Sequence, residues 1–165
     1  MHRRPHPFWR YSLATYRDPA VAAACLALQD RWNADVNLLL YCGWLGQGGR
    51  LVNKRHLRMA MAKVQPLQTE IIGPLRRARR TLKHPPAGVP KAWARQLKDR
   101  ISATELDLEY VEQGILLAIA KRLPPSKRRA IPQAAVGANL SRYLDLLDVP
   151  PAHADRRIAM RLLAA

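Results

Sequence analysis

The strongest chemical signal in the sequence is a cluster of cations. The cluster consists of Arg76, Arg77, Arg79, Arg80 and Lys83. A guanidinium group binds phosphate or carboxylate oxygens through paired N–H groups, and an ammonium group adds a point charge. A second basic group, which includes Arg128 and Arg129, follows two consecutive prolines. These seven cations are the predicted anion-binding residues, and the predicted partner is RNA or an acidic protein.

The total charge supports the same prediction. The chain has 165 residues with 28 Lys and Arg against 12 Asp and Glu, so its formal net charge is +16. A net charge of roughly 2–8 already keeps a small domain soluble, and the excess favours an anionic macromolecule as partner. Two alternatives stay open. The cations could form a solvated face only, and charge does not distinguish RNA from an acidic protein.

A second set of polar and aromatic residues lies beside the most apolar stretch of the chain. This set consists of Tyr11, Ser12, Tyr16, Asp35, Asn37 and Trp44. Buried polar side chains need hydrogen-bond partners, so the set could line a small pocket between the first three helices. The protein would then bind a small molecule or act as an enzyme. In the alternative interpretation, Asp35 caps a helix and the aromatic rings belong to the core.

Acidic residues are concentrated in one segment, at Glu105, Asp107, Glu109 and Glu112. Paired carboxylates can hold a divalent metal in a helical bundle, but the Glu-x-x-His motif of such sites is missing. We therefore expect ion pairs with a neighbouring basic helix, at residues N-terminal to the arginine cluster. The five histidines are scattered and no nucleophile motif occurs. The sequence thus predicts no metal and no cofactor, and it favours a non-enzymatic protein.

The spacing of apolar residues predicts an all-α, single-domain bundle of six or seven helices. Helices are expected over 8–16, 19–32 and 36–45, the last two with Asp18 and Asp35 as N-caps. Residues 38–45 are apolar on every face, so their helix should be central and buried. Two further helices are expected within 133–147 and 152–163. Residues 1–7 are predicted to form a flexible basic arm, and residues 8–165 the domain.

Two long helices are expected to form a kinked hairpin. The first begins after Asn53 and contains Pro66 and Pro74, which should kink or divide it. The second covers 91–123, where apolar residues alternate steps of four and three in a coiled-coil-like spacing. A proline-rich linker over 84–90 joins the two. The same spacing would also suit a homodimer built on the long helices.

Targeting signals are not evident in the sequence. No stretch approaches the roughly 20 apolar residues of a transmembrane helix. The basic N-terminus is not followed by the apolar core of a secretory signal. A cytoplasmic location is therefore expected.

Three sequence blocks resemble a known family. Phe-Trp-Arg-Tyr-Ser-Leu-Ala-Thr-Tyr at 8–16 is followed by Asp-Val-Asn-Leu-Leu-Leu at 35–40, and Pro-Leu-Arg at 74–76 precedes Arg79 and Arg80. The pattern is similar to an uncharacterised proteobacterial family of short helical proteins, a domain of unknown function with a Phe-Trp-x-[Phe/Tyr]-Ser-Leu-x-x-Tyr start. The resemblance is strongest over residues 1–85. It implies a bacterial, cytoplasmic, all-helical protein and supplies no catalytic residue.

Overall fold

The structure, a computed structural model, describes residues 5–124 and 130–164. All regular elements in these ranges are helices, so the predicted all-α class is confirmed. They are α1 (Pro7–Tyr16), α2 (Pro19–Trp32), α3 (Val36–Gln47), α4 (Lys54–Pro66), the π-helix η1 (Leu67–Ile72), α5 (Gly73–Thr81), α6 (Lys91–Lys121), α7 (Pro132–Leu146) and α8 (Ala154–Ala164). None of these helices is long and apolar enough to cross a membrane.

Capping residues set the helix starts where the sequence predicts them. Asp18 Oδ1 accepts a hydrogen bond from Ala20 N at 2.8 Å, and Asp35 Oδ1 accepts one from Asn37 N at 2.8 Å. Asn53 Oδ1 does the same for His56 N at the start of α4. Each cap satisfies a backbone N–H that has no partner within its helix. At the N-terminus, α1 begins at Pro7 and His6 caps it, so this part of the predicted arm belongs to the helix start.

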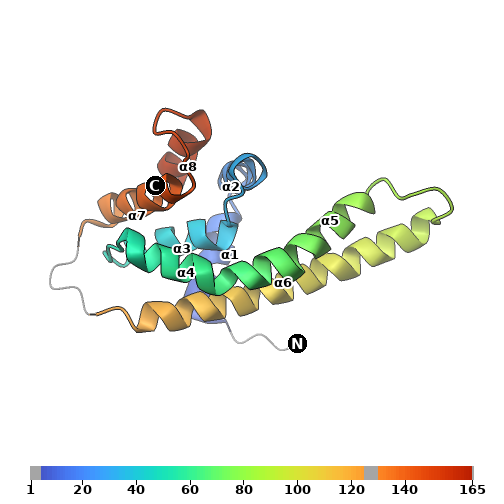
Figure 1. Cartoon of the computed structure of the whole chain (residues 1–165), viewed down its shortest axis with the longest axis horizontal. Coiled ribbons are helices and arrows are strands. Elements are labelled where there is room, and N and C mark those ends of the chain that lie inside the picture. The colour runs from blue at the N-terminus through green and yellow to red at the C-terminus, as the bar shows by residue number, and fades with distance from the viewer. Residues whose placement is uncertain (1–4, 125–129, 165) are drawn as a thin grey trace.

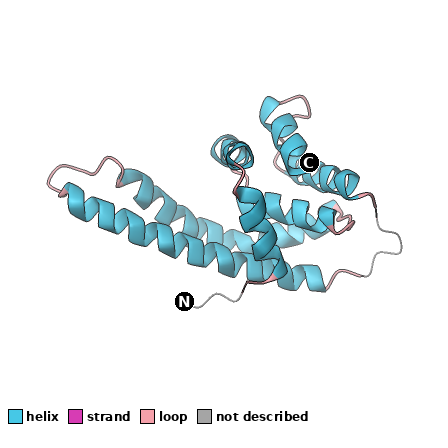
Figure 2. Ribbon diagram, turned by 180° about the vertical axis from the view of Figure 1, so that it is seen from behind, coloured by secondary structure: helices cyan, strands magenta, loops and turns pink. Residues whose placement is uncertain are grey.

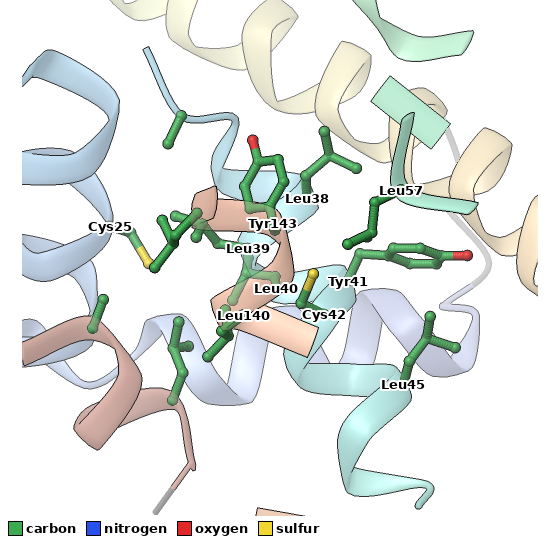
Figure 3. Packing of buried hydrophobic residues seen from close by; sticks show 14 of the residues in the cluster. Cys25, Leu38, Leu39, Leu40, Tyr41, Cys42, Leu45, Leu57, Leu140 and Tyr143 are labelled. Atoms are coloured by element: carbon green, nitrogen blue, oxygen red, sulfur yellow. The ribbon is translucent and has the colours of Figure 1, made fainter. Parts of the chain in front are cut away.

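Helix α3 lies at the centre of the core, as predicted. Its apolar residues point in all directions and are buried, from Leu38 through Cys42 to Leu45 (Figure 3). Helix α7 packs most extensively against it, with Leu140 and Tyr143 in the shared core. Helices α1, α2, α6 and α8 also contact α3. An all-round apolar helix is stable in water only when neighbours cover it in this way.

The long hairpin is present, and its first arm stays helical through both prolines. Pro66 and Pro74 each lack the N–H that an α-helix needs for its i to i−4 bond. Between them, η1 adopts wider π-helical turns, in which Gly73 N donates to Gln68 O five residues earlier. If α4, η1 and α5 are counted as one rod, the described residues form seven helices, which is the upper number that the sequence predicts. This rod lies along α6, and the hairpin extends beyond the rest of the protein (Figures 1 and 2).

The hairpin register differs from the predicted one. Arg79, in the last turn of α5, pairs with Glu105, which lies far inside α6. About three turns of α6 therefore extend beyond the end of α5, and we call residues 91–101 the overhang. The connection from 82 to 90 runs outward along the hairpin (Figure 1). This register determines which residues of α5 lie opposite the acidic residues of α6.

We expect Gly46→Ala to destabilise the protein, because α3 and α7 touch at this glycine. A Cβ on Gly46 would overlap the backbone N and Cα of Val136. Overpacking of this kind costs about 1–3 kcal/mol. Urea unfolding monitored by circular dichroism measures the loss.

The matched control is Gly137→Ala in α7. A Cβ there meets no atom within 4 Å, so alanine should stabilise the helix by roughly 0.5–1 kcal/mol. Equal free energies of unfolding for the two variants would contradict the close contact between α3 and α7.

Candidate functional site

A cavity of about 470 Å³ lies where α1, α2 and α3 meet the hairpin. We call it the arginine pocket, because Arg76, Arg79 and Arg80 line it together with Lys83. Ser12, Tyr16 and Asn37 line the same cavity. Part of each predicted set of site residues thus meets at one place, although the sequence separates the two sets by dozens of positions.

Carboxylates lie close to three of the five cations in the arginine cluster. Arg79 donates to Glu105 through Nε at 2.7 Å and Nη2 at 3.2 Å, in a two-pronged ion pair. Arg80 Nη2 lies 2.6 Å from Asp30 Oδ1 in α2. Arg76 Nη2 lies 3.8 Å from Glu109 Oε1, which is beyond hydrogen-bond distance.

Glu105 and Glu109 therefore pair with a basic helix, as predicted, but at a different place. They face the arginine cluster itself, whereas the prediction placed them opposite residues N-terminal to it. The reason is the overhang, which shifts α6 along α5. Burial raises the pKa of Glu109, and Arg76 opposes part of that rise.

A chain of buried side chains forms the wall behind the pocket. Ser12 Oγ donates to Gln113 Oε1 at 3.1 Å, and Gln113 Nε2 donates to Asn37 Oδ1 at 2.8 Å. Asn37 Nδ2 donates to Glu112 Oε2 at 2.8 Å, and Gln68 Nε2 donates to the same oxygen at 2.7 Å. The chain links α1, α3, α6 and η1, and Gln68 reaches it from η1.

Asp35 and Glu112 form an acid pair at the end of this chain. As two carboxylates, Asp35 Oδ2 and Glu112 Oε1 would both be buried without a donor. One shared proton satisfies both oxygens. Burial raises the pKa of Glu112, and the charge of Asp35 and the hydrogen bond to it raise the pKa further. The proton therefore belongs to Glu112, while Asp35 accepts backbone N–H groups at the start of α3, where negative charge is favoured.

A second cavity, of about 440 Å³, lies on the other side of this wall. Asp35, Gln68 and Tyr143 line it, and Tyr143 Oη accepts a hydrogen bond from Asp35 N at 2.9 Å. Arg77 lines this second cavity, whereas Arg76 lines both. The arginine cluster is thus divided between the two sides of the hairpin.

Not all predicted residues join the pocket. The Tyr11 hydroxyl lies against Gly43, where a Cβ would overlap it, and Trp44 stacks on Phe8 with ring centroids 5.2 Å apart. Both therefore pack against the core and are not among the residues that line either cavity. Arg128 and Arg129 lie outside the described residues.

Gln68, Gln113 and the pairing of Glu112 with Asp35 are absent from the sequence-based prediction. A signal for Glu112 exists, because it lies four residues after Leu108 and three before Ile115, on the apolar stripe of α6. A polar residue on such a stripe must find a buried partner. Within 5–124 and 130–164, no group of three or more His, Cys, Asp and Glu side chains could hold a metal ion.

We expect Glu112→Gln to change the pH dependence of stability. An amide can replace the protonated carboxyl group as donor to Asp35 and as acceptor for Asn37 and Gln68. In the wild type, Glu112 keeps its proton in the folded state and loses it in the unfolded state above about pH 4.5. Wild-type stability should therefore fall relative to the variant as pH rises from 5 to 8, by up to about 1.4 kcal/mol per pH unit.

Urea unfolding at several pH values measures this difference. Glu70→Gln, at an exposed position of η1, is the matched control and should leave the pH profile unchanged. A constant difference between wild type and Glu112→Gln across this pH range would mean that Glu112 carries no extra proton when folded.

Comparisons with known proteins place the chain in a family. Searches of curated proteins and of solved structures gave no match. A family model matches residues 7–116, a range that contains α1 to α5, most of α6 and all residues of the arginine pocket. The match extends well beyond the segment in which the sequence blocks resemble such a family. The chain belongs to the family DUF2390, which is described as a protein of unknown function.

Proposed function

We propose that this protein is a non-enzymatic adaptor that binds RNA through its cationic hairpin. The observation that carries the proposal is the charge of residues 76–100, which contain nine Lys or Arg and a single acidic residue, Asp99. Their net charge of +8 is half of the net charge of the chain. Asp99 lies 3.6 Å from its neighbour Lys98, so it neutralises only an adjacent side chain. A projecting, strongly basic element suits a phosphate backbone.

The exposed cations of the hairpin are only partly the ones that the sequence predicts as anion-binding residues. Arg79 pairs closely with Glu105, and the Arg76 side chain is only 19% exposed, so both are less available for a large partner. Arg77 and Lys83 are exposed and are not among the ion pairs of the described residues. The overhang adds three exposed cations, at Lys91, Arg95 and Arg100. We therefore propose that the RNA-binding surface combines the end of α5 with the overhang. Arg128 and Arg129 remain part of the prediction.

An aromatic ring on the overhang favours RNA over an acidic protein. Trp93 is 62% exposed and lies between Lys91 and Arg95 in the sequence. Leu97, also on the overhang, is exposed as well. Unpaired bases stack on such rings, while nearby cations contact the phosphates. An acidic protein offers carboxylates but no bases to stack.

The test is fluorescence anisotropy with a labelled single-stranded 20-nucleotide RNA over a series of salt concentrations. Lys91→Glu/Arg95→Glu should weaken binding and make the salt dependence shallower, by roughly 0.7 in log–log slope for each phosphate that the variant no longer neutralises. Trp93→Ala should cost about 1–3 kcal/mol of binding free energy at every salt concentration, because no ring remains for a base to stack on.

Helix α8 offers matched controls. Arg157 and Arg161 are exposed and four residues apart, and Ile158 beside them is 41% exposed. Arg157→Glu/Arg161→Glu changes the net charge by the same amount, and Ile158→Ala removes a comparable exposed apolar group. Equal losses of affinity on α8 and on the overhang would reject a defined surface. Binding to polyglutamate that equals binding to RNA, with no effect of Trp93→Ala, would favour an acidic protein as partner.

A further inference from the structure

We infer that the arginine pocket is a binding site for a small organic anion. The acid group of this ligand meets Arg76, and its apolar body lies against Trp9, Leu13 and Leu106. The inference goes beyond the proposed RNA-binding surface and does not depend on it, because Lys91, Trp93 and Arg95 do not line the pocket.

Arg76 lines the arginine pocket and has no carboxylate within hydrogen-bond distance. Its side chain is only 19% exposed, and the nearest carboxylate oxygen, from Glu109, is 3.8 Å away. Arg79 and Arg80 differ, because their carboxylate partners lie at 2.7 and 2.6 Å. A guanidinium carries five N–H donors, and those of Arg76 are not among the described buried nitrogen atoms that lack a partner, so they are open to the cavity. A carboxylate, sulfonate or phosphate oxygen in the pocket could accept hydrogen bonds from them.

The charges around the cavity favour an anion over a cation. Four cationic side chains line it, and three acidic ones: Asp30, Glu105 and Glu109. Two of these acids are already bound tightly to Arg80 and Arg79. The raised pKa of Glu109 makes this residue a weaker competitor for Arg76, because burial disfavours its charged form.

A tyrosine adds a neutral donor beside Arg76. Burial raises the pKa of Tyr16 to about 12. Glu109 contributes to the rise, and Arg76 opposes it. Its hydroxyl group therefore keeps its proton at neutral pH and can donate to an oxygen of the acid group.

The rest of the cavity suits an apolar body. Leu26, Leu40 and Val36 complete the apolar part of the lining around the ring of Trp9. The amides of Asn37 and Gln113 already donate within the buried chain, so they shape the wall more than they attract a ligand. A volume of about 470 Å³ is within the range of small-molecule pockets. The ligand class is thus an aromatic or aliphatic acid of metabolite size.

The test uses two fluorescent probes of similar shape. The first, 1-anilinonaphthalene-8-sulfonate, carries a sulfonate, whereas the second, N-phenyl-1-naphthylamine, is neutral. Arg76→Gln should weaken binding of the sulfonate about tenfold or more, the loss of one charge-assisted hydrogen bond. It should leave binding of the neutral probe unchanged. Glu109→Gln should tighten binding of the sulfonate several-fold, because it removes the carboxylate that competes for Arg76.

A third variant fills the cavity. Leu106 is 40% exposed on the pocket wall, and Leu106→Trp should weaken binding of both probes. The matched controls are Leu51→Trp, at a leucine that is 50% exposed outside the pocket, and Arg157→Gln on α8. Neither should change binding of either probe.

Three outcomes would overturn the inference. These are unchanged sulfonate binding in Arg76→Gln and Glu109→Gln, equal effects on the charged and the neutral probe, and an effect of Arg157→Gln as large as that of Arg76→Gln. If circular dichroism shows that Arg76→Gln is unfolded, Glu109→Gln and Leu106→Trp still decide the question. Glu109→Gln predicts a gain of affinity for the sulfonate alone, whereas a destabilised fold, which exposes apolar surface, would bind both probes more strongly. Lys91→Glu/Arg95→Glu should leave probe binding unchanged, so failure of this inference and failure of RNA binding can be told apart.

Discussion

Because α3 is apolar around its whole circumference, other helices must cover it on every side. Helix α7 covers one side closely enough that only glycine fits at position 46, while α1, α2, α6 and α8 cover the others. Burial of such a helix contributes roughly 25 cal/mol for each Å² of apolar surface removed from water. The long hairpin is fixed to the body largely because α6 supplies one of these covering faces.

The N-terminal turn of α3 is polar, and this explains the buried hydrogen-bond chain. Asp35 and Asn37 lie at the point where α3 passes beneath the hairpin, so their side chains lose water when α6 covers them. Glu112 and Gln113 of α6 and Gln68 of η1 supply the missing partners. A chain of this kind contributes more to the choice of one register than to stability, since a shift of α6 would leave several polar groups without partners.

Local features of the fold were predictable from sequence. The caps at Asp18, Asp35 and Asn53 and the span of α6 follow from nearby residue types and periodicity. The hairpin register was not predictable, because a proline-rich connection limits the conformation of the chain without fixing its direction. The composition of the arginine pocket depends on that register. The sequence could therefore supply Arg76, Ser12 and Asn37 as separate candidates, but not their meeting in one cavity or the roles of Gln68 and Gln113.

The π-helical segment between Pro66 and Pro74 has a consequence for how the chain tolerates changes in length. A π-helical turn holds one residue more than an α-helical turn, and each residue of an α-helix rotates the chain by about 100°. Loss of one residue from 67–72, with a return to regular α-helix, would remove the residue that the wider turn accommodates and would leave α5 in nearly the same orientation relative to α4. Arg76 and Arg79 would still face Glu109 and Glu105. Loss of one residue from a regular helix turns everything that follows it by about 100°, but here the wider turns would absorb the change and the cavity would keep its cations.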